Sequence, residues 1–453
     1  MNALQLAQAA RGRLVQGSPA WEIPRAVADS REVQPGDLFV AIEGERTDGH
    51  LFVGQALAAG AQGALVNRAV EPPPGPAVVE VADVRRALLS AARTMAEEYT
   101  GLVCAVTGSV GKTTTKEIWA ACLGPLGDVF RNPGNYNSDI GMPLALFSLR
   151  KTHHAAVFEL GMRGQGEIRR LARILKPKIG VITLIGDSHL SELGSVDAIA
   201  RAKSELLSEL PVGGTAVLNA DDPYMSQLRL SAPPNILLVG RGADADLRIV
   251  RHESLGTSGS RLLLRYGGLE CGGEVTFVGE GAVLDAALAI GGAIAAGVSF
   301  ADAVAALANA RPAKGRLRTY AFAGLTVIDD TYNASPQSLG VALALLRDLP
   351  ASGRRIAVLG DMRELGDAEV EMHRAMGRDA AHSADLVLAI GDFSQTVAQA
   401  TRDAGGQALA IADVDGIVAE LRGQAHPGDV VLFKASRSVG LERAVERLRE
   451  ALQ

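Results

Sequence analysis

Short apolar runs alternate with longer stretches of mixed polarity through most of the chain. Residues 101–107 form one largely apolar run that leads into Gly108, a pattern typical of a buried parallel strand. Similar runs, with helical stretches between them, recur at 155–160, 180–185 and 215–218. Because strands that alternate with helices build parallel sheets, the middle of the chain predicts a doubly wound α/β sheet.

Both ends of the chain repeat this alternation. Ahead of the middle part, two strands are predicted at 37–42 and 64–66, and two helices at 51–59 and 84–99. Beyond it, four apolar runs predict a second large α/β unit, at 325–329, 355–359, 386–390 and 429–433.

Residues 239–278 look different, because they combine many glycines with short alternating runs. They predict a small β insertion or appendage. We therefore expect an α/β protein of three domains, spanning residues 1–83, 84–312 and 313–453.

Composition places the chain among ordinary globular proteins. Apolar residues make up 47% of its 453 residues and charged residues 21%, which excludes disordered, collagen-like and disulfide-stapled chains. The net charge of −6 and the 4% of aromatic residues argue against nucleic acid as a partner, since that usually needs a basic face or stacking rings. The three cysteines lack metal-site spacing, so we expect buried thiols.

No segment has the pattern of a signal peptide or a membrane span. Polar residues interrupt the N-terminus from Gln5 through Arg13. The longest weakly polar stretch, between Asp285 and Asp302, is mostly alanine and glycine. It is shorter than the ~20 residues of a span and predicts a closely packed buried helix. We expect a cytoplasmic protein and, since nothing demands an oligomer, a monomer.

A phosphate-binding loop is the strongest single motif. Between a predicted strand and a predicted helix, the chain reads Thr107, Gly108, Ser109, Val110, Gly111, Lys112, Thr113, Thr114. Small residues let backbone N–H groups close on phosphate oxygens, and the helix start adds a positive dipole end. Lys112 can reach the β- and γ-phosphates, and the Thr113 hydroxyl can ligate Mg²⁺. The loop is a shortened variant, because Val106 stands where the general motif has its first glycine.

Further polar residues follow the predicted strands. Glu159 ends an apolar run, where the ligands of open α/β sheets gather, and its carboxylate can hold Mg²⁺. His189 comes after the next run, Lys203 lies on a predicted helix, and Asn135 and Asn137 belong to a polar loop. Alone, each such residue is more often a cap, a surface charge or a structural histidine. Their combination therefore decides the interpretation.

Together these residues resemble the Mur ligase family, whose members use ATP to form amide bonds in bacterial cell-wall synthesis. The central part of the resemblance consists of the phosphate loop, Asn135-x-Asn-x-x-Ile-Gly-x-Pro143, Glu159-x-Gly161, His189 and Lys203. The resemblance to the family's UDP-sugar domain rests on two motifs, Asp29-Ser-Arg-x-Val-x-Pro-Gly-Asp-Leu-Phe-Val-Ala41 and Gly44-Glu-Arg-x-Asp-Gly-His50. The resemblance to the branch of the family that uses D-alanyl-D-alanine rests on three motifs, Asp329-Asp-Thr-Tyr-Asn-Ala-Ser-Pro336, Leu359-Gly-Asp-Met-Arg-Glu-Leu-Gly366 and Lys434-Ala-Ser-Arg437. The resemblance covers essentially the whole chain.

The resemblance implies a small N-terminal α/β UDP-sugar domain, a central P-loop ATPase-like doubly wound sheet and a C-terminal Rossmann-like α/β domain. It implies that ATP activates the carboxylate of UDP-MurNAc-tripeptide as an acyl phosphate, which the amine of D-alanyl-D-alanine attacks. Lys112 is then expected at the phosphates, Thr113 and Glu159 at a first Mg²⁺, and His189 at a second. The lysine that matches Lys203 is carbamylated in the family, which predicts N6-carboxylysine beside the metal.

The same resemblance implies further contacts. It predicts Arg316 at the γ-phosphate, Asp330 at the ribose and Asp285 at the adenine. The UDP-sugar is expected at Ser30 and Arg31, and the nucleotide or acceptor side at Asn135 and Asn137. The D-alanyl-D-alanine side is expected at Asn333, Ser335 and Pro336.

The chain departs from the family pattern around the adenine. The family usually has Gly-x-His-Asn-Val-x-Asn, whereas residues 279–285 read Gly-Glu-Gly-Ala-Val-Leu-Asp. An ionised Asp285 only accepts hydrogen bonds, whereas an amide also donates them. Leu184 and Ser335 stand where asparagine is common, and Ala435 where glycine is. The phosphate and metal residues are intact.

Two alternatives remain beside this ligase. One is a related ATP-dependent amide ligase that takes another amino acid or a folate-like acceptor, against which the Asp29-Ser-Arg31 and Gly360–Leu365 motifs argue. The other is a nucleotide-binding homologue that has lost turnover, which the altered adenine segment favours.

Overall fold

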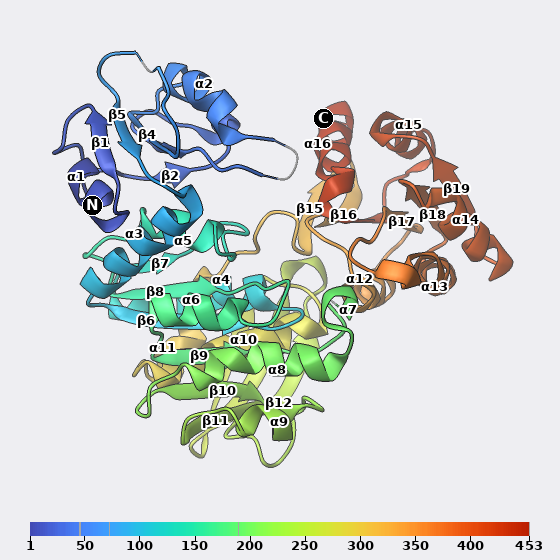
Figure 1. The fold of residues 1–453 in the computed structure, drawn as a ribbon. Coiled ribbons are helices and arrows are strands. Elements are labelled where there is room, and N and C mark those ends of the chain that lie inside the picture. The colour runs from blue at the N-terminus through green and yellow to red at the C-terminus, as the bar shows by residue number, and fades with distance from the viewer. Residues whose placement is uncertain (45–46, 72, 189, 453) are drawn as a thin grey trace.

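Three α/β units follow one another along the chain (Figure 1). The computed structural model describes residues 1–44, 47–71, 73–188 and 190–452. In the view of Figure 1, the first and last units lie side by side above the central unit, so all three approach one another at the middle. The fold class predicted from the sequence is confirmed.

The N-terminal unit is a five-stranded sheet with the order β1-β5-β4-β3-β2, in which only β1 runs antiparallel to its neighbour. Its strands are β1 (Arg13–Gln16), β2 (Ala26–Val27), β3 (Leu38–Val40), β4 (Gly63–Val66) and β5 (Ala77–Glu80). Its helices are α1 (Ala3–Ala9), α2 (Val53–Ala58) and α3 (Val84–Glu98). Leu88 of α3 packs on this sheet, whereas Ala92, one turn later, packs against the central unit. The helix α3 therefore joins the first two units.

The central unit is a nine-stranded sheet with the order β14-β13-β12-β11-β10-β9-β6-β8-β7. The strands from β7 to β12 pair in parallel, and β12, β13 and β14 pair antiparallel. The strands are β6 (Leu102–Thr107), β7 (Val129–Arg131), β8 (Ala155–Glu159), β9 (Ile179–Ile182), β10 (Thr215–Asn219), β11 (Asn235–Gly240), β12 (Leu247–Ser254), β13 (Ser260–Tyr266) and β14 (Leu269–Val275). Residues 239–278 are thus an extension of the central sheet and not a separate appendage.

Helices cover both faces of this sheet. They are α4 (Lys112–Cys122), α5 (Gly141–Leu146), α6 (Glu167–Leu175), α7 (Leu190–Leu193), α8 (Val196–Ser208), α9 (Met225–Arg229), α10 (Glu280–Ala295) and α11 (Phe300–Ala305). Because successive strand residues face opposite sides, Val106 packs with α4 and α10 while Ala105 packs with α6 and α8. The predicted buried helix is α10, and Gly292 on it leaves no room for a Cβ beside the indole of Trp119.

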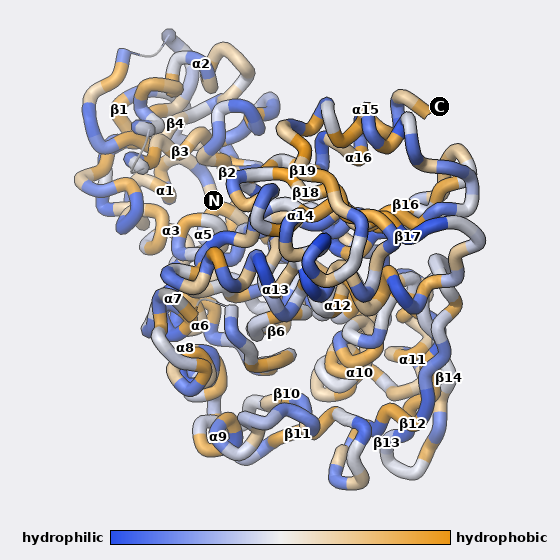
Figure 2. Tube along the Cα trace, turned by 90° about the vertical axis from the view of Figure 1, so that its right-hand side faces the viewer, coloured by the Kyte–Doolittle hydropathy of each residue, from blue (hydrophilic) through white to orange (hydrophobic). Residues whose placement is uncertain are grey.

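The C-terminal unit is a six-stranded sheet with the order β15-β16-β20-β17-β18-β19, parallel except for β15. Its strands are β15 (Arg318–Phe322), β16 (Leu325–Asp330), β17 (Arg355–Leu359), β18 (Leu386–Ile390), β19 (Ala408–Ile411) and β20 (Val430–Lys434). Its helices are α12 (Pro336–Asp348), α13 (Glu369–Ala381), α14 (Ser394–Asp403), α15 (Val414–Gln424) and α16 (Glu442–Leu452). The first three pack on one face and the last two on the other, and Figure 2 shows the hydrophobic strands β16 and β18 between them.

The predicted run at 180–185 ends earlier as a strand than expected. β9 stops at Ile182, because the next residues leave the sheet and bond to the phosphate loop. Among the described residues, no helix is long and apolar enough to cross a membrane.

Candidate active site

The predicted phosphate loop lies between β6 and α4, as its motif requires. Gly111 caps α4 with a φ of 88°, and a Cβ on it would lie 2.2 Å from a carboxylate oxygen of Asp285. The loop is braced from the segment after β9: the Ser109 N–H donates to the carbonyl of Leu184 at 2.7 Å, and the Gly186 N–H donates to the Ser109 hydroxyl at 2.9 Å. The loop is therefore fixed at the start of α4, where the first N–H groups of a helix have no intrahelical partner and can bind an anion.

Two lysines meet at this loop. The ammonium of Lys112 donates to the carbonyls of Gly108 and Ser109 at 2.7 and 3.1 Å, and Lys203, buried on α8, donates to the same Gly108 carbonyl at 2.9 Å. Burial, and then the charge of Lys112, hold the pKa of Lys203 well below its usual range. Burial also lowers the pKa of Lys112; Glu159 opposes this shift and Arg316 adds to it.

Glu159 ends β8 as predicted and is almost fully buried. One carboxylate oxygen accepts from the Thr113 hydroxyl at 2.7 Å, and the other accepts from the Asn137 amide at 2.8 Å. A buried carboxylate beside a hydroxyl suits a hard divalent cation such as Mg²⁺. Asn132, which the sequence reasoning missed, holds the Glu159 backbone by accepting its N–H at 2.8 Å.

A large cleft of about 960 Å³ opens beside these residues, and all three units contribute to its wall. The central unit contributes the loop from Ser109 to Thr114 with Asn135, Asn137 and Glu159. The C-terminal unit contributes Arg316, Asn333, Ser335 and Pro336, and also the segment Arg363 to Leu365. The N-terminal unit contributes Gly44 and Thr47, joined by Arg85 of α3. The structure therefore brings together most of the predicted nucleotide, metal and acceptor residues.

Several predicted residues lie elsewhere. Lys203 sits behind the phosphate loop, and Asp330 is paired with the buried Lys434 at 2.5 Å. In the N-terminal unit, Ser30 is half-buried and Arg31 is exposed, and Arg31 pairs with Asp29 at 2.6 Å. None of these side chains belongs to the cleft wall. The predicted metal ligand His189 lies outside the described residues.

Asp285 lies on α10, beneath the phosphate loop, and is 8% exposed. The Thr115 hydroxyl donates to its carboxylate at 3.1 Å. Burial raises the pKa of Asp285 to about 8, although the Thr115 bond and Lys112 oppose the shift. A protonated carboxyl can donate as well as accept, as an amide does.

A smaller cavity of about 430 Å³ adjoins the cleft, and Asn135 and Tyr332 line both. Its wall includes Arg25, Lys314 and Arg437. Arg25 is paired with Asp37 and Lys314 with Glu446, so two of these three cations already have acidic partners.

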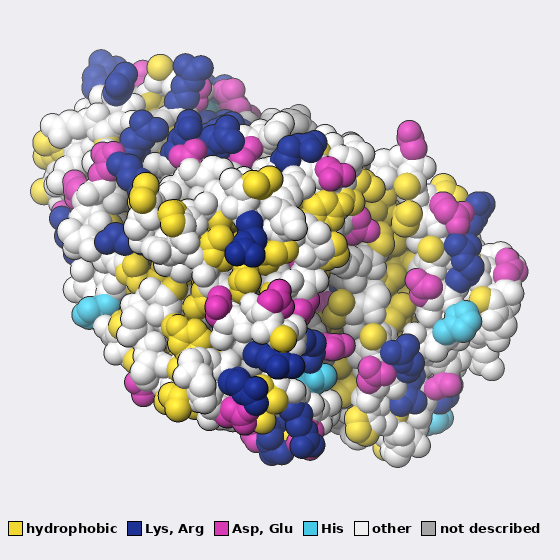
Figure 3. Space-filling model, turned by 90° about the horizontal axis from the view of Figure 1, so that it is seen from below, with side chains coloured by type: hydrophobic (Ala, Val, Ile, Leu, Met, Phe, Trp, Pro, Cys, Tyr) yellow, Lys and Arg dark blue, Asp and Glu magenta, His cyan; other side chains and the backbone are white. Residues whose placement is uncertain are grey.

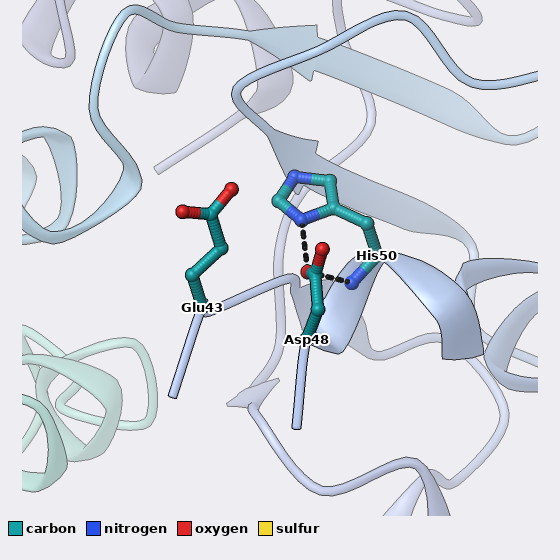
Figure 4. A group of neighbouring side chains, drawn as sticks. All are labelled: Glu43, Asp48 and His50. Atoms are coloured by element: carbon teal, nitrogen blue, oxygen red, sulfur yellow. Dashed lines mark hydrogen bonds and ion pairs between the residues drawn. The ribbon is translucent and has the colours of Figure 1, made fainter. Parts of the chain in front are cut away.

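A group of potential metal ligands, Glu43, Asp48 and His50, lies in the N-terminal unit (Figure 4). The His50 Nδ1 is 2.7 Å from Asp48, and its Nε2 accepts from the Asn67 N–H at 3.1 Å. Arg68 pairs with the second oxygen of Asp48. Because both imidazole nitrogens are engaged, the group is explained as a structural hydrogen-bond network.

Charges of both signs are mixed on one face of the molecule. On the face drawn in Figure 3, lysines and arginines are interspersed with aspartates and glutamates. This face therefore lacks the continuous basic patch that nucleic acid binding uses.

Three family models match the chain in order. The Mur ligase family catalytic domain matches residues 22–99, the Mur ligase middle domain residues 106–293, and the Mur ligase glutamate ligase domain residues 315–437. Together they span nearly the whole sequence.

Relatives and solved structures agree with this match. A UDP-N-acetylmuramoyl-tripeptide–D-alanyl-D-alanine ligase from Bacillus subtilis is 33% identical over 98% of this chain and 98% of its own. The enzyme of that name from Synechocystis is 37% identical over 93% and 90%. A crystal structure of MurF from Acinetobacter baumannii has a TM-score of 0.84 at 34% identity, covering 99% of this chain and 98% of that chain. MurF ligase from Thermotoga maritima in complex with ADP has a TM-score of 0.78 at 28% identity, covering 95% and 98%.

Proposed function

The chain belongs to the Mur ligase family, and we propose that it joins D-alanyl-D-alanine to UDP-MurNAc-tripeptide with ATP, in the cytoplasmic synthesis of peptidoglycan precursors. The observation that carries this proposal is the full-length similarity to ligases that bear this name. The cleft supports it, because a phosphate loop, a buried carboxylate and residues of all three units line one cavity.

The chemistry follows from the poor leaving ability of a carboxylate oxygen. A tripeptide carboxylate oxygen attacks the γ-phosphorus of ATP, the bond to the β-phosphate oxygen breaks, and ADP leaves. The amine nitrogen then attacks the acyl carbon, phosphate leaves with the electrons of the acyl–oxygen bond, and the nitrogen releases a proton. Since the first step brings anions together, stabilisation of negative charge dominates the task.

Residues of this chain can supply that stabilisation. Lys112 and the N–H groups at the start of α4 would hold the phosphates, and Arg316 would face the γ-phosphate from the C-terminal unit. Thr113 and Glu159 would hold Mg²⁺, which supplies positive charge at the phosphate oxygens. We propose a division of labour in which residues 1–83 bind the UDP-sugar, 84–312 bind ATP and 313–453 bind the incoming amine.

We also propose that Lys203 is carbamylated. Its amine nitrogen would bond to the carbon of CO₂ and release a proton, which turns the side chain into a carboxylate. The lowered pKa of Lys203 supports this step, because only the neutral amine is a nucleophile. The product would lie at the phosphate loop, where Lys203 donates to the Gly108 carbonyl.

The proposal is tested by phosphate release with ATP, Mg²⁺, UDP-MurNAc-tripeptide and D-alanyl-D-alanine, each omitted in turn. We expect release only when all four are present, with tripeptides ending in diaminopimelate or lysine both tried. Phosphate release with GTP in place of ATP tests whether Asp285 contributes to base selectivity. Release with another amine would favour the related amide ligase, and binding without release under any condition would favour the inactive homologue.

A further inference from the structure

Two arginines lie close to the ring of Tyr332, at the boundary of the two cavities. The guanidinium carbon of Arg316 is 3.9 Å from the centre of its ring, and that of Arg437 is 5.7 Å away. The ring lines both the phosphate-loop cleft and the smaller cavity beside it. Neither the phosphate-loop motif nor the metal ligands account for a tyrosine at this point.

In the described part of the chain, Arg316 has few other contacts that could fix its position. It stands in residues 311–317, a connection without helix or strand between the central and C-terminal units. The Nε of Arg316 is buried, and among the described residues it has no hydrogen-bond partner. The backbone holds the two segments together as well, since the Tyr332 N–H donates to the Gly315 carbonyl at 3.1 Å.

One of these two arginines shares the cleft with the phosphate loop. Arg316 lines the same cleft as Lys112 and Glu159, and its charge acts on the pKa of Lys112, after the larger effects of burial and Glu159. A guanidinium stacked on an aromatic face keeps all its N–H groups at the rim free to donate, whereas an ion pair would occupy some of them. The arrangement therefore presents a cation that is oriented but still available.

We propose that Tyr332 is a positioning residue, whose ring face holds the Arg316 guanidinium over the cleft for the γ-phosphate of ATP. This inference rests on the proposed function, since it assigns a role within the same reaction. Tyr332 itself need not touch the nucleotide. Its contribution is to restrict a long side chain that stands on an irregular connection.

Two substitutions separate the ring face from the hydroxyl. Tyr332→Phe retains the face, and Tyr332→Leu removes it with a similar volume. In titrations with Mg²⁺, we expect Tyr332→Leu to weaken binding of a non-hydrolysable ATP analogue about tenfold, because cation–π contacts of buried groups have roughly this effect. Binding of ADP, which lacks the γ-phosphate, should change less than about twofold. Tyr332→Phe should restore wild-type discrimination between the two ligands.

A double variant tests that Tyr332 acts through Arg316. Arg316→Ala should abolish the preference for the analogue, and adding Tyr332→Leu should weaken binding no further. In turnover assays, Tyr332→Leu should lower kcat while the KM for UDP-MurNAc-tripeptide stays constant. Equal weakening of ADP and the analogue, or independent effects of the two substitutions, would overturn the inference.

Two further measurements keep the test decisive. If Tyr332→Leu does not fold, Tyr332→His replaces it: a protonated imidazole repels Arg316, so analogue affinity should fall between pH 8 and pH 6 more steeply than in the wild type. A pH profile like that of the wild type would contradict the inference. If phosphate release fails with every amine while the analogue preference still depends on Tyr332, the proposed function is wrong and the positioning role stands.

Discussion

Lys112 and Lys203 donate to one and the same acceptor, the backbone carbonyl of Gly108, at 2.7 and 2.9 Å. Two ammonium groups this close repel each other, and burial penalises the charge of both. The larger effect is on Lys203, since burial and the charge of Lys112 hold its pKa well below its usual range. Lys203 is thus a candidate for chemistry that needs a neutral amine.

Carbamylation of Lys203 is the first prediction. Protein equilibrated with carbon-13-labelled bicarbonate should give one carbamate carbon resonance, which Lys203→Met abolishes. Lys176→Arg is the control, because Lys176 is exposed and paired with Glu97 at 3.2 Å. Turnover should fall when CO₂ is stripped at low pH and return with bicarbonate. A resonance that survives in Lys203→Met would rule out this site.

Replacement of Asp285 should change the pH dependence of stability. Because burial raises the pKa of Asp285 to about 8, the folded protein retains a proton that the unfolded chain releases above about pH 4. The free energy of unfolding therefore falls as the pH rises from about 4 to about 8. Asp285→Asn lacks this loss. The difference in free energy of unfolding between the variant and the wild type should therefore grow in favour of the variant, to a few kcal/mol at pH 8 (about 1.4 kcal/mol for each pKa unit).

The measurement is the thermal midpoint of Asp285→Asn and wild type at pH 5 and pH 8. The gain in midpoint should be larger at pH 8. Asp244→Asn, at an exposed carboxylate, should change the midpoint little at either pH. A gain that is the same at both values would mean that Asp285 is ionised throughout.

Local chemistry of the site could be predicted from the sequence, because it depends on short spacings. The strand before Gly108 and the helix after Lys112 follow from an apolar run and a glycine pair, and Glu159 follows from its place at the end of a strand. The shared carbonyl at Gly108 and the Arg316–Tyr332 stack could not, since they join segments far apart in the chain. Only tertiary packing creates such contacts.

The fold shows the same limit. Fully buried apolar strands such as β18 were predicted within a residue of their bounds, whereas β19 (Ala408–Ile411), half of it alanine and partly exposed, carries little β propensity and was missed. The end of β9 depends on bonds to the phosphate loop rather than on its own residues. Boundaries of this kind are determined by the partner segment.

Asn137 should tune Mg²⁺ binding through Glu159. Its amide donates to one carboxylate oxygen at 2.8 Å, so Asn137→Leu leaves that oxygen free to rotate away from the metal. Groups that orient a metal ligand typically contribute about 10- to 100-fold in affinity or activity. We expect the Mg²⁺ concentration for half-maximal phosphate release to rise by about 10-fold or more.

Asn135→Ala is the contrasting variant, because Asn135 lines the cleft without a side-chain bond to Glu159 in the described structure. It should change the KM of a substrate and leave the Mg²⁺ requirement nearly constant. An equal rise in Mg²⁺ requirement for both variants would indicate a general disturbance of the loop.

Lys112→Ala tests the division of labour between the units. Lys112 lines the cleft at the phosphate loop. In the proposed reaction its charge would act on the transferring phosphate, so its removal should reduce turnover by about 100- to 1000-fold or more. The N-terminal sheet, five strands with their own buried core, makes no use of Lys112. Binding of UDP-MurNAc-tripeptide, measured by calorimetry without nucleotide, should therefore change less than about twofold.

The thermal midpoint of Lys112→Ala serves as the control for folding. Alanine is a strong helix former and suits the first turn of α4, so we expect the variant to fold. If tripeptide binding and turnover both fall while the thermal midpoint stays unchanged, the UDP-MurNAc-tripeptide itself contacts the phosphate loop. The proposed division of labour between the units would then be wrong.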